Sequence, residues 1–110
     1  MTLLKAIVRP DKVDAIQAAL DKAGVAGMTV SEVRGHGKQK GHAAIYRGKE
    51  YNITLLPKIS IDVVVSDTQV SAAVRAITEA ARTGEIGDGR IFEIPVANSY
   101  SIRTGERADG

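Results

Sequence analysis

The stretch "PKISIDVVVSDTQVSAAVRAITEA", residues 57–80, contains the clearest strand and the clearest helix of the chain, one directly after the other. In its first part, β-branched residues recur at every second position, the period of a strand with one buried face: Ile59, Ile61, Val63 and Val65. In its second part, apolar residues recur at helical spacing: Val70, Ala73, Val74 and Ile77. Ser66 or Asp67 is placed to cap this helix, and Gly84 follows its end.

Further strands and a second helix are predicted around this pair. Strands are predicted at residues 3–9, 27–35 and 89–96, a helix at 11–24, and a short additional strand at 100–103. Pro10 ends the first strand, Asp11 is placed to cap the helix, and Gly24 to end it. The order β-α-β-β-α-β predicts an α+β ferredoxin-like sandwich, with two helices on one face of a four-stranded antiparallel sheet.

The other face of this sheet also carries apolar residues. Ile7, Val33 and Val64 belong to it, and no predicted element remains to cover them. Exposed apolar faces of this kind are typical of interaction surfaces, so we expect self-association.

The connection between the second and third strands is long for so small a fold, with about 20 residues and no strong helical period. Connections of this length inside a compact domain are usually functional. Within it, "AAIY" (43–46) and "YNIT" (51–54) are expected to pair as a hairpin, and they carry two of the four aromatic residues. Because an isolated hairpin is marginal in water, we expect an arm that settles against another surface.

Composition and charge limit the class of protein. At 110 residues with 44% hydrophobic and 25% charged residues, the chain is expected to be one soluble domain, residues 1–110. The absence of cysteine, of a membrane-length apolar run and of a signal-peptide pattern favours a cytoplasmic protein. The net charge is +2, yet residues 34–58 carry six basic side chains and one acidic one. This predicts an anionic ligand or partner, although charge alone slightly favours a solvated basic loop.

The first glycine-rich segment, "RGHGKQKGH" (34–42), follows the second strand. Its glycines allow tight turns whose N–H groups can line an anion pocket, but a flexible loop explains the pattern equally well. The spacing matches neither a dinucleotide fingerprint nor a P-loop. His36 and His42 have no cysteine or acidic cluster beside them, which makes a metal site improbable.

The second segment, "TGEIGDGR" (83–90), joins the second helix to the last strand. Gly87, Asp88 and Gly89 ahead of Arg90 are consistent with a polyphosphate cradle, and equally with a β-turn that enters a strand. No nucleophile–base–acid set is visible anywhere in the sequence, so no enzyme is predicted.

Taken together, these segments resemble the P-II family of nitrogen-regulatory signal-transduction proteins. The resemblance covers nearly the whole chain and is carried by "KAIVRPDKVDAI", "GMTVSEVRGHGKQKGH", "YRGKEY", "LPK", "ARTGEIGDGRIF" and "IRTGER". It implies a cytoplasmic homotrimer whose sheets face inward and whose three intersubunit clefts bind ATP or ADP, with 2-oxoglutarate binding beside Mg-ATP. Residues 37–55 correspond to the T-loop, which docks onto regulated enzymes or an ammonium transporter at the membrane. Tyr51 corresponds to the tyrosine that a nucleotidylyltransferase modifies.

The resemblance also implies roles for individual residues. The nucleotide-binding positions are Thr29, Gly35, Gly37, Lys38, Gln39, Val64, Gly87, Asp88, Gly89, Arg90, Ser101 and Arg103. Thr29 and Val64 would contact the adenine region, and the loop 87–90 would wrap the phosphates. The 2-oxoglutarate-binding positions are Gln39, Lys40, Gly41 and Lys58, with Gln39 also holding Mg²⁺.

Departures from the family pattern leave alternatives open. Lys38 replaces the usual arginine and loses its bidentate fork, whereas Arg90 replaces a lysine. Ser101 replaces a phosphate-binding arginine, and loss of such a contact costs roughly 1.5–3 kcal/mol, which weakens the expected ATP affinity. Lys49 stands where some members carry a phosphorylated serine. The alternatives are a divergent sensor that reads another small anion, and a slow ATPase; nucleic-acid binding lacks a recognisable motif.

Overall fold

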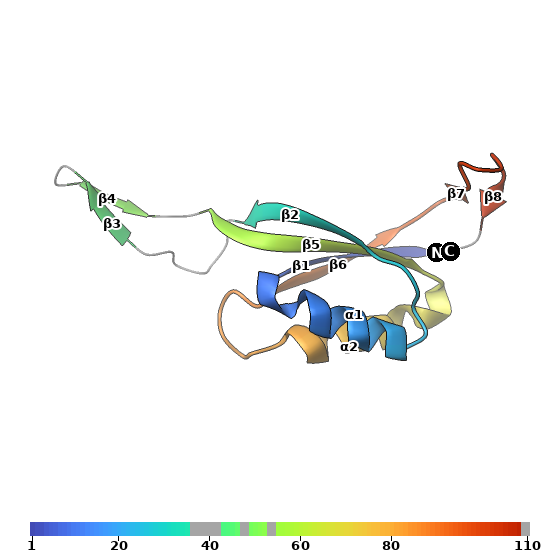
Figure 1. Cartoon of the computed structure of the whole chain (residues 1–110), viewed down its shortest axis with the longest axis horizontal. Coiled ribbons are helices and arrows are strands. Elements are labelled where there is room, and N and C mark those ends of the chain that lie inside the picture. The colour runs from blue at the N-terminus through green and yellow to red at the C-terminus, as the bar shows by residue number, and fades with distance from the viewer. Residues whose placement is uncertain (36–42, 47–48, 53–54, 109–110) are drawn as a thin grey trace.

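The computed structural model describes residues 1–35, 43–46, 49–52 and 55–108, the second and third of these ranges by their backbone alone. Its elements follow one another as Figure 1 shows. They are β1 (Thr2–Val8), the 3-10 turn η1 (Pro10–Lys12), α1 (Val13–Lys22), β2 (Thr29–Gly35), β3 (Ala43–Tyr46), β4 (Lys49–Asn52), β5 (Leu56–Val65), the 3-10 turn η2 (Asp67–Gln69), α2 (Val70–Ala81), β6 (Gly89–Pro95), β7 (Ser99–Tyr100) and β8 (Arg107–Ala108).

The main sheet has four antiparallel strands in the order β2-β5-β1-β6, and both helices lie on one of its faces (Figure 1). The predicted ferredoxin-like βαββαβ sandwich is therefore confirmed. Alternate residues of β1 and β5 point toward the helices, and Leu4 lies opposite Val63 and Ala6 opposite Ile61. These residues form the core with apolar positions of both helices. Its buried members are Leu4, Ala6, Val8, Ile16, Leu20, Val25, Ile61, Val63, Val65, Ala73, Ile77 and Ala81.

The predicted ends of the helices are partly confirmed. Gly24 has a φ of +80°, and its N–H donates to the Asp21 carbonyl at 3.1 Å, which ends α1 as predicted. The cap predicted at Asp11 is wrong: this residue lies inside η1, and no side chain caps α1. Pro10 explains the difference, because its fixed φ and missing N–H suit the first position of the turn. The capping position is then Arg9, two residues before Asp11.

Ser66, one of the two predicted caps, is the capping residue of the 3-10 turn η2, which leads directly into α2. The Ser66 N–H donates to the Gln69 side-chain oxygen at 3.2 Å, the contact of a capping box. Asp67 instead accepts hydrogen bonds from the Met1 amino group at 2.9 Å and the Thr2 hydroxyl at 3.0 Å. These two contacts lower the pKa of Asp67, the bond from the amino group most.

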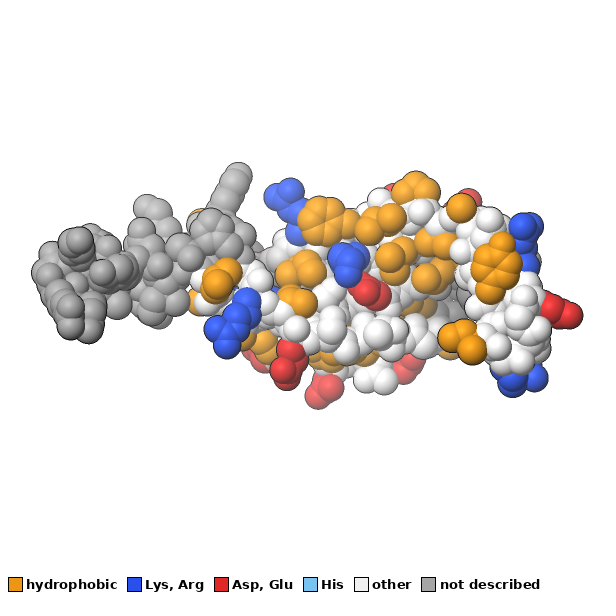
Figure 2. All heavy atoms as spheres, turned by 90° about the horizontal axis from the view of Figure 1, so that it is seen from above, with side chains coloured by type: hydrophobic (Ala, Val, Ile, Leu, Met, Phe, Trp, Pro, Cys, Tyr) orange, Lys and Arg blue, Asp and Glu red, His pale blue; other side chains and the backbone are white. Residues whose placement is uncertain are grey.

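The face of the sheet opposite the helices carries apolar side chains, as predicted from Ile7, Val33 and Val64. Figure 2 looks onto this face and shows hydrophobic side chains gathered along it. Val64 is 38% exposed, Phe92 45% and Ile94 38%. No described element covers them in the single chain.

Two short hairpins lie outside the main sheet (Figure 1). In the first, Tyr46 pairs with Lys49 and Ala43 with Asn52. The second strand of this hairpin therefore begins at Lys49, two residues before the predicted 51–54. The register leaves residues 47–48 between the two strands, where the turn was expected, so only the extent of the second strand differs.

The second hairpin corrects the strand predicted at 100–103. Only Tyr100 of that range is in a strand, since β7 pairs with β8 and the residues after Tyr100 form a turn. The Gly105 N–H donates to the Ser101 carbonyl at 2.7 Å, and the Ser101 N–H donates to the Glu106 carbonyl at 2.9 Å. These local bonds return the chain on itself before an extended strand can form. Among the described residues, no helix has the length and hydrophobicity needed to cross a membrane.

Candidate functional site

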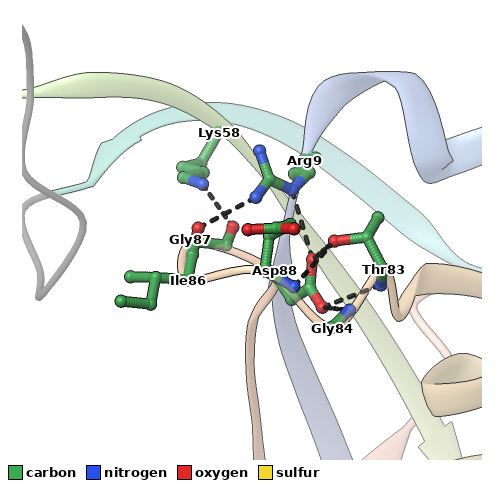
Figure 3. A network of polar contacts seen from close by, with 8 residues as sticks. Arg9, Lys58, Thr83, Gly84, Ile86, Gly87 and Asp88 are labelled. Carbon is green, nitrogen blue, oxygen red and sulfur yellow. Dashed lines mark hydrogen bonds and ion pairs between the residues drawn. The ribbon is translucent and has the colours of Figure 1, made fainter.

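The candidate site lies at the end of the sheet where the connection between α2 and β6 passes the ends of β1 and β5. Strand pairing explains this placement, because Val8 at the end of β1 lies opposite both Gly89 and Ile59. Lys58 therefore reaches the connecting loop, and its ammonium group donates to the Gly87 carbonyl at 2.7 Å (Figure 3). Lys58, for which the resemblance implied 2-oxoglutarate, and Gly87, for which it implied a nucleotide, are thus in direct contact.

Asp88 organises this loop from the inside. Its carboxylate accepts hydrogen bonds from the N–H of Thr83 at 2.8 Å and of Gly84 at 2.9 Å, and from the Thr83 hydroxyl (Figure 3). These bonds, those of Thr83 most of all, hold the pKa of Asp88 well below its ordinary value. The carboxylate is therefore ionised at neutral pH and is used to shape the loop.

Arg9, a residue that the sequence did not single out, closes the loop from the side of β1. Its Nε lies 3.3 Å from the Asp88 carboxylate, and its Nη2 donates to the Ile86 carbonyl at 2.9 Å (Figure 3). The contacts join residues 79 and 77 positions apart in the chain. The sequence shows only that a basic residue precedes Pro10. The contacts of Arg9 with the loop depend on the strand pairing, which the sequence does not reveal.

Gly89 has a structural reason to be glycine. Its φ is +111°, and a Cβ at this position would lie 1.8 Å from the Ile7 carbonyl oxygen. The loop therefore enters β6 so close to the β1 backbone that no side chain fits. Gly87 also has a positive φ, +102°. The sequence left open whether this segment is a β-turn or a phosphate cradle. The two readings are compatible, because the turn places the loop backbone beside the cations of Arg9 and Lys58.

The two cations, Arg9 and Lys58, give this end of the sheet its electrostatic character. Partial burial lowers the pKa of Lys58, and the nearby Arg9 lowers it further, while Asp88 opposes the shift. Both cations donate to loop carbonyls, at Ile86 and Gly87. Gly35, another predicted position, lies beside them, since a Cβ there would be 3.2 Å from the Lys58 Cγ. The arrangement suits an anion, which accepts hydrogen bonds from cations more strongly than a neutral carbonyl does.

The remaining described positions lie away from this loop. Val64 pairs with Leu3 near the start of β1, whereas Thr29 pairs with Asp62 in the middle of the sheet. Ser101 and Arg103 lie in the turn between β7 and β8, which Figure 1 shows at the far end from the α2–β6 loop. The Ser101 hydroxyl accepts from the Thr104 N–H at 3.4 Å. One chain therefore does not bring all the predicted nucleotide-binding residues together.

Several predicted residues lie outside the described part of the chain. They are Gly37, Lys38, Gln39, Lys40 and Gly41, and the side chain of Tyr51, whose backbone belongs to β4. Among the residues that the structure describes, no cluster of histidine, aspartate or glutamate is arranged to hold a metal ion.

The sequence pattern of the whole chain matches a known family. The profile of the family described as "Nitrogen regulatory protein P-II" matches residues 1–106. The chain belongs to the P-II family. P-II proteins are signal-transduction regulators of nitrogen metabolism and not enzymes, so the resemblance and the function predicted from the sequence are confirmed at this level.

Curated P-II proteins are similar to this chain over almost its full length. The chain is 53% identical to the nitrogen regulatory protein P-II of Nostoc punctiforme over 107 residues, covering 97% of this chain and 96% of the relative. It is 50% identical to the P-II protein of Cereibacter sphaeroides, covering 99% and 97%. It is 49% identical to that of Azospirillum brasilense, covering 97% and 96%.

Proposed function

We propose that this P-II protein senses ATP or ADP together with 2-oxoglutarate in clefts between the copies of a homotrimer. The observation that carries the proposal is the separation of the predicted nucleotide positions within one chain. Gly35, Lys58 and residues 87–90 lie at one end of the sheet, and Val64 lies toward its other end. Thr29 lies between them on β2, and Ser101 and Arg103 lie in the turn between β7 and β8. A head-to-tail contact around a closed ring places opposite ends of neighbouring copies together. A complete site then requires a second copy.

The nucleotide phosphates would be held by backbone N–H groups of the loop 87–90 and by Arg90, with Arg103 supplied by the neighbouring copy. The loop is already shaped for this by Asp88 and Arg9, so little ordering is needed on binding. Thr29 and Val64, both exposed in the single chain, would contact the adenine.

The 2-oxoglutarate carboxylate would take Lys58 as its cation. Lys58 donates to the neutral carbonyl of Gly87. A ligand carboxylate in place of that carbonyl would form a stronger, charge-assisted hydrogen bond. Lys40 and Gly41 would add backbone N–H groups. Mg²⁺ would be held by Gln39 and the ligands' own oxygens, which fits the metal's preference for oxygen and the absence of an acidic cluster among the described residues.

The output would be the T-loop, residues 37–55. Its described part includes the hairpin of β3 and β4, which forms a sheet of its own beside the four-stranded one (Figure 1). Each ligand would favour the loop conformation to which it binds better, and the loop would present that conformation to a regulated enzyme or an ammonium transporter. Tyr51, on β4, is the position for modification by a nucleotidylyltransferase. This function places the protein in the cytoplasm, with recruitment to the membrane through a transporter.

Calorimetric titration tests the proposal. ATP and ADP are titrated with Mg²⁺, each with and without 2-oxoglutarate. We expect both nucleotides to bind, and 2-oxoglutarate to bind only after Mg-ATP. If neither nucleotide binds at millimolar concentration, the proposal is wrong.

Ser101 favours one alternative, a P-II sensor that reads adenine nucleotide with a different small anion. The missing charge at this position weakens the case for the usual ligand pair. Nucleotide binding that 2-oxoglutarate leaves unchanged would select this alternative.

A further inference from the structure

An ion pair lies in the middle of the face of the sheet opposite the helices, away from the loop between α2 and β6. Lys5 on β1 is directly opposite Asp62 on β5. The Lys5 ammonium group lies 3.0 Å from one carboxylate oxygen and 3.2 Å from the other. Ser60, whose side chain is buried, lies 3.4 Å from both the ammonium and the carboxylate. Both charges are thus satisfied within one chain.

The surroundings of this pair are apolar on the side of β6, where Phe92 lies directly opposite Lys5. Two residues back along β1, Leu3 lies between Val64 and Ile94. On the side of β2, Asp62 lies opposite Thr29. Figure 2 shows basic and acidic side chains among hydrophobic ones on this face. The Lys5 side chain is 38% exposed and that of Asp62 33%, so water still reaches both in the single chain.

A second copy of this chain is the occupant that fits this face. The candidate site is divided between the two ends of the sheet, and only another copy supplies the missing half. Such a contact covers the apolar residues around Lys5 and Asp62 and removes water from the pair. The assembled protein would then contain a buried ion pair with apolar side chains along its β6 side.

We infer that the Lys5–Asp62 pair determines the specificity of self-assembly, because this face can be buried when both charges are present or both are replaced, but not when only one remains. The inference rests on the assembly in the proposed function. Removing one partner of a buried pair leaves an uncompensated charge in a dry interface, which is strongly unfavourable. Replacing both partners with neutral residues is often tolerated. Chains with matched charges at these two positions therefore assemble, and a chain that has lost only one of the charges does not.

The test uses Lys5→Met, Asp62→Asn and the double variant, with the state of assembly followed by sedimentation velocity over a range of protein concentrations. Each single variant should raise the concentration needed for assembly by about a hundredfold or more. The double variant should return to within about tenfold of the wild type. Lys22→Met and Asp14→Asn, exposed changes of the same kind on α1, serve as matched controls and should assemble normally.

Circular dichroism shows whether each variant folds. Little change in the spectrum is expected, because the pair is solvent-accessible in the single chain and such pairs contribute little to its stability. Single variants that assemble like the wild type would overturn the inference. So would a double variant whose loss of assembly equals the two single losses combined. A wild-type protein that stays monomeric would instead contradict the trimer of the proposed function, so the two failures are distinguishable.

Discussion

At the scale of the single residue, Gly89 shows how closely the loop and the sheet are fitted. Both Gly89 and Gly84 have positive φ, but a Cβ at Gly89 would clash with the Ile7 carbonyl, whereas nothing lies within 4 Å of one at Gly84. Gly84→Ala should cost about 1–3 kcal/mol in the free energy of unfolding, from backbone strain alone. Gly89→Ala should cost clearly more, because β6 must also move. Urea unfolding of both variants measures this, and equal losses would contradict the clash.

Arg9 is predicted to act on nucleotide binding by positioning the loop. Arg9→Met removes the contacts to Asp88 and to the Ile86 carbonyl. Because the pair is partly exposed, we expect a modest loss of about 1 kcal/mol, or roughly fivefold in ATP affinity. Amide exchange at Gly84 and Ile86 should become faster. Arg75→Met on the exposed face of α2 is the control, and unchanged exchange in Arg9→Met would rule out the positioning role.

Asp88 predicts a pH dependence with a definite sign. Its pKa is lowered in the folded protein, so its contribution to stability is fully present above its ordinary value of 3.8 and is lost as the pH falls below it. Asp88→Asn should therefore be less stable than the wild type at pH 5–8. The difference should shrink as the pH falls below about 4, where the aspartate of the unfolded chain becomes protonated. Urea unfolding across this range tests it, and a difference independent of pH would be contrary to the prediction.

At the scale of the element, the start of α2 depends on one side chain. Gln69 accepts a hydrogen bond from the Ser66 N–H, and its amide lies 3.5 Å from the Gly24 carbonyl at the end of α1. Gln69→Ala should reduce the free energy of unfolding by about 1 kcal/mol, the usual cost of losing a cap. Gln69→Glu keeps the acceptor and should recover most of the loss. Ser71→Ala, an exposed change in the same turn, is the control for helix propensity.

The elements themselves were predictable, and their exact ends were not. Periods of two and of about 3.6 residues identified every strand of the main sheet and both helices, because burial of one face imposes those periods. The cap at Asp11 and the strand at 100–103 were mispredicted. In both places local chemistry decided the outcome: the fixed φ of Pro10, and the bonds that Ser101 makes within its own turn.

At the scale of the whole molecule, a nucleotide site shared between copies predicts complementation. Arg90→Ala and Arg103→Ala remove residues from opposite ends of the sheet, so neither variant alone forms a complete cleft. In trimers mixed at random from equal amounts of both, about a quarter of the clefts receive both arginines. We expect calorimetry to show weak ATP binding for each pure variant and partial recovery after co-refolding. No recovery in verified mixed trimers would place the complete site within one chain.

The amino-acid pattern alone predicts the order of elements, the uncovered apolar face, the two glycine-rich segments and the P-II resemblance, because each is a local pattern or a run of residues. Which side chains meet depends on how the elements pack. The contacts of Arg9 with Asp88, of Lys58 with Gly87 and of Lys5 with Asp62 join residues 29 to 79 positions apart. The register of the strands determines these contacts. Register follows from packing of the whole core and cannot be read from the period of any single segment.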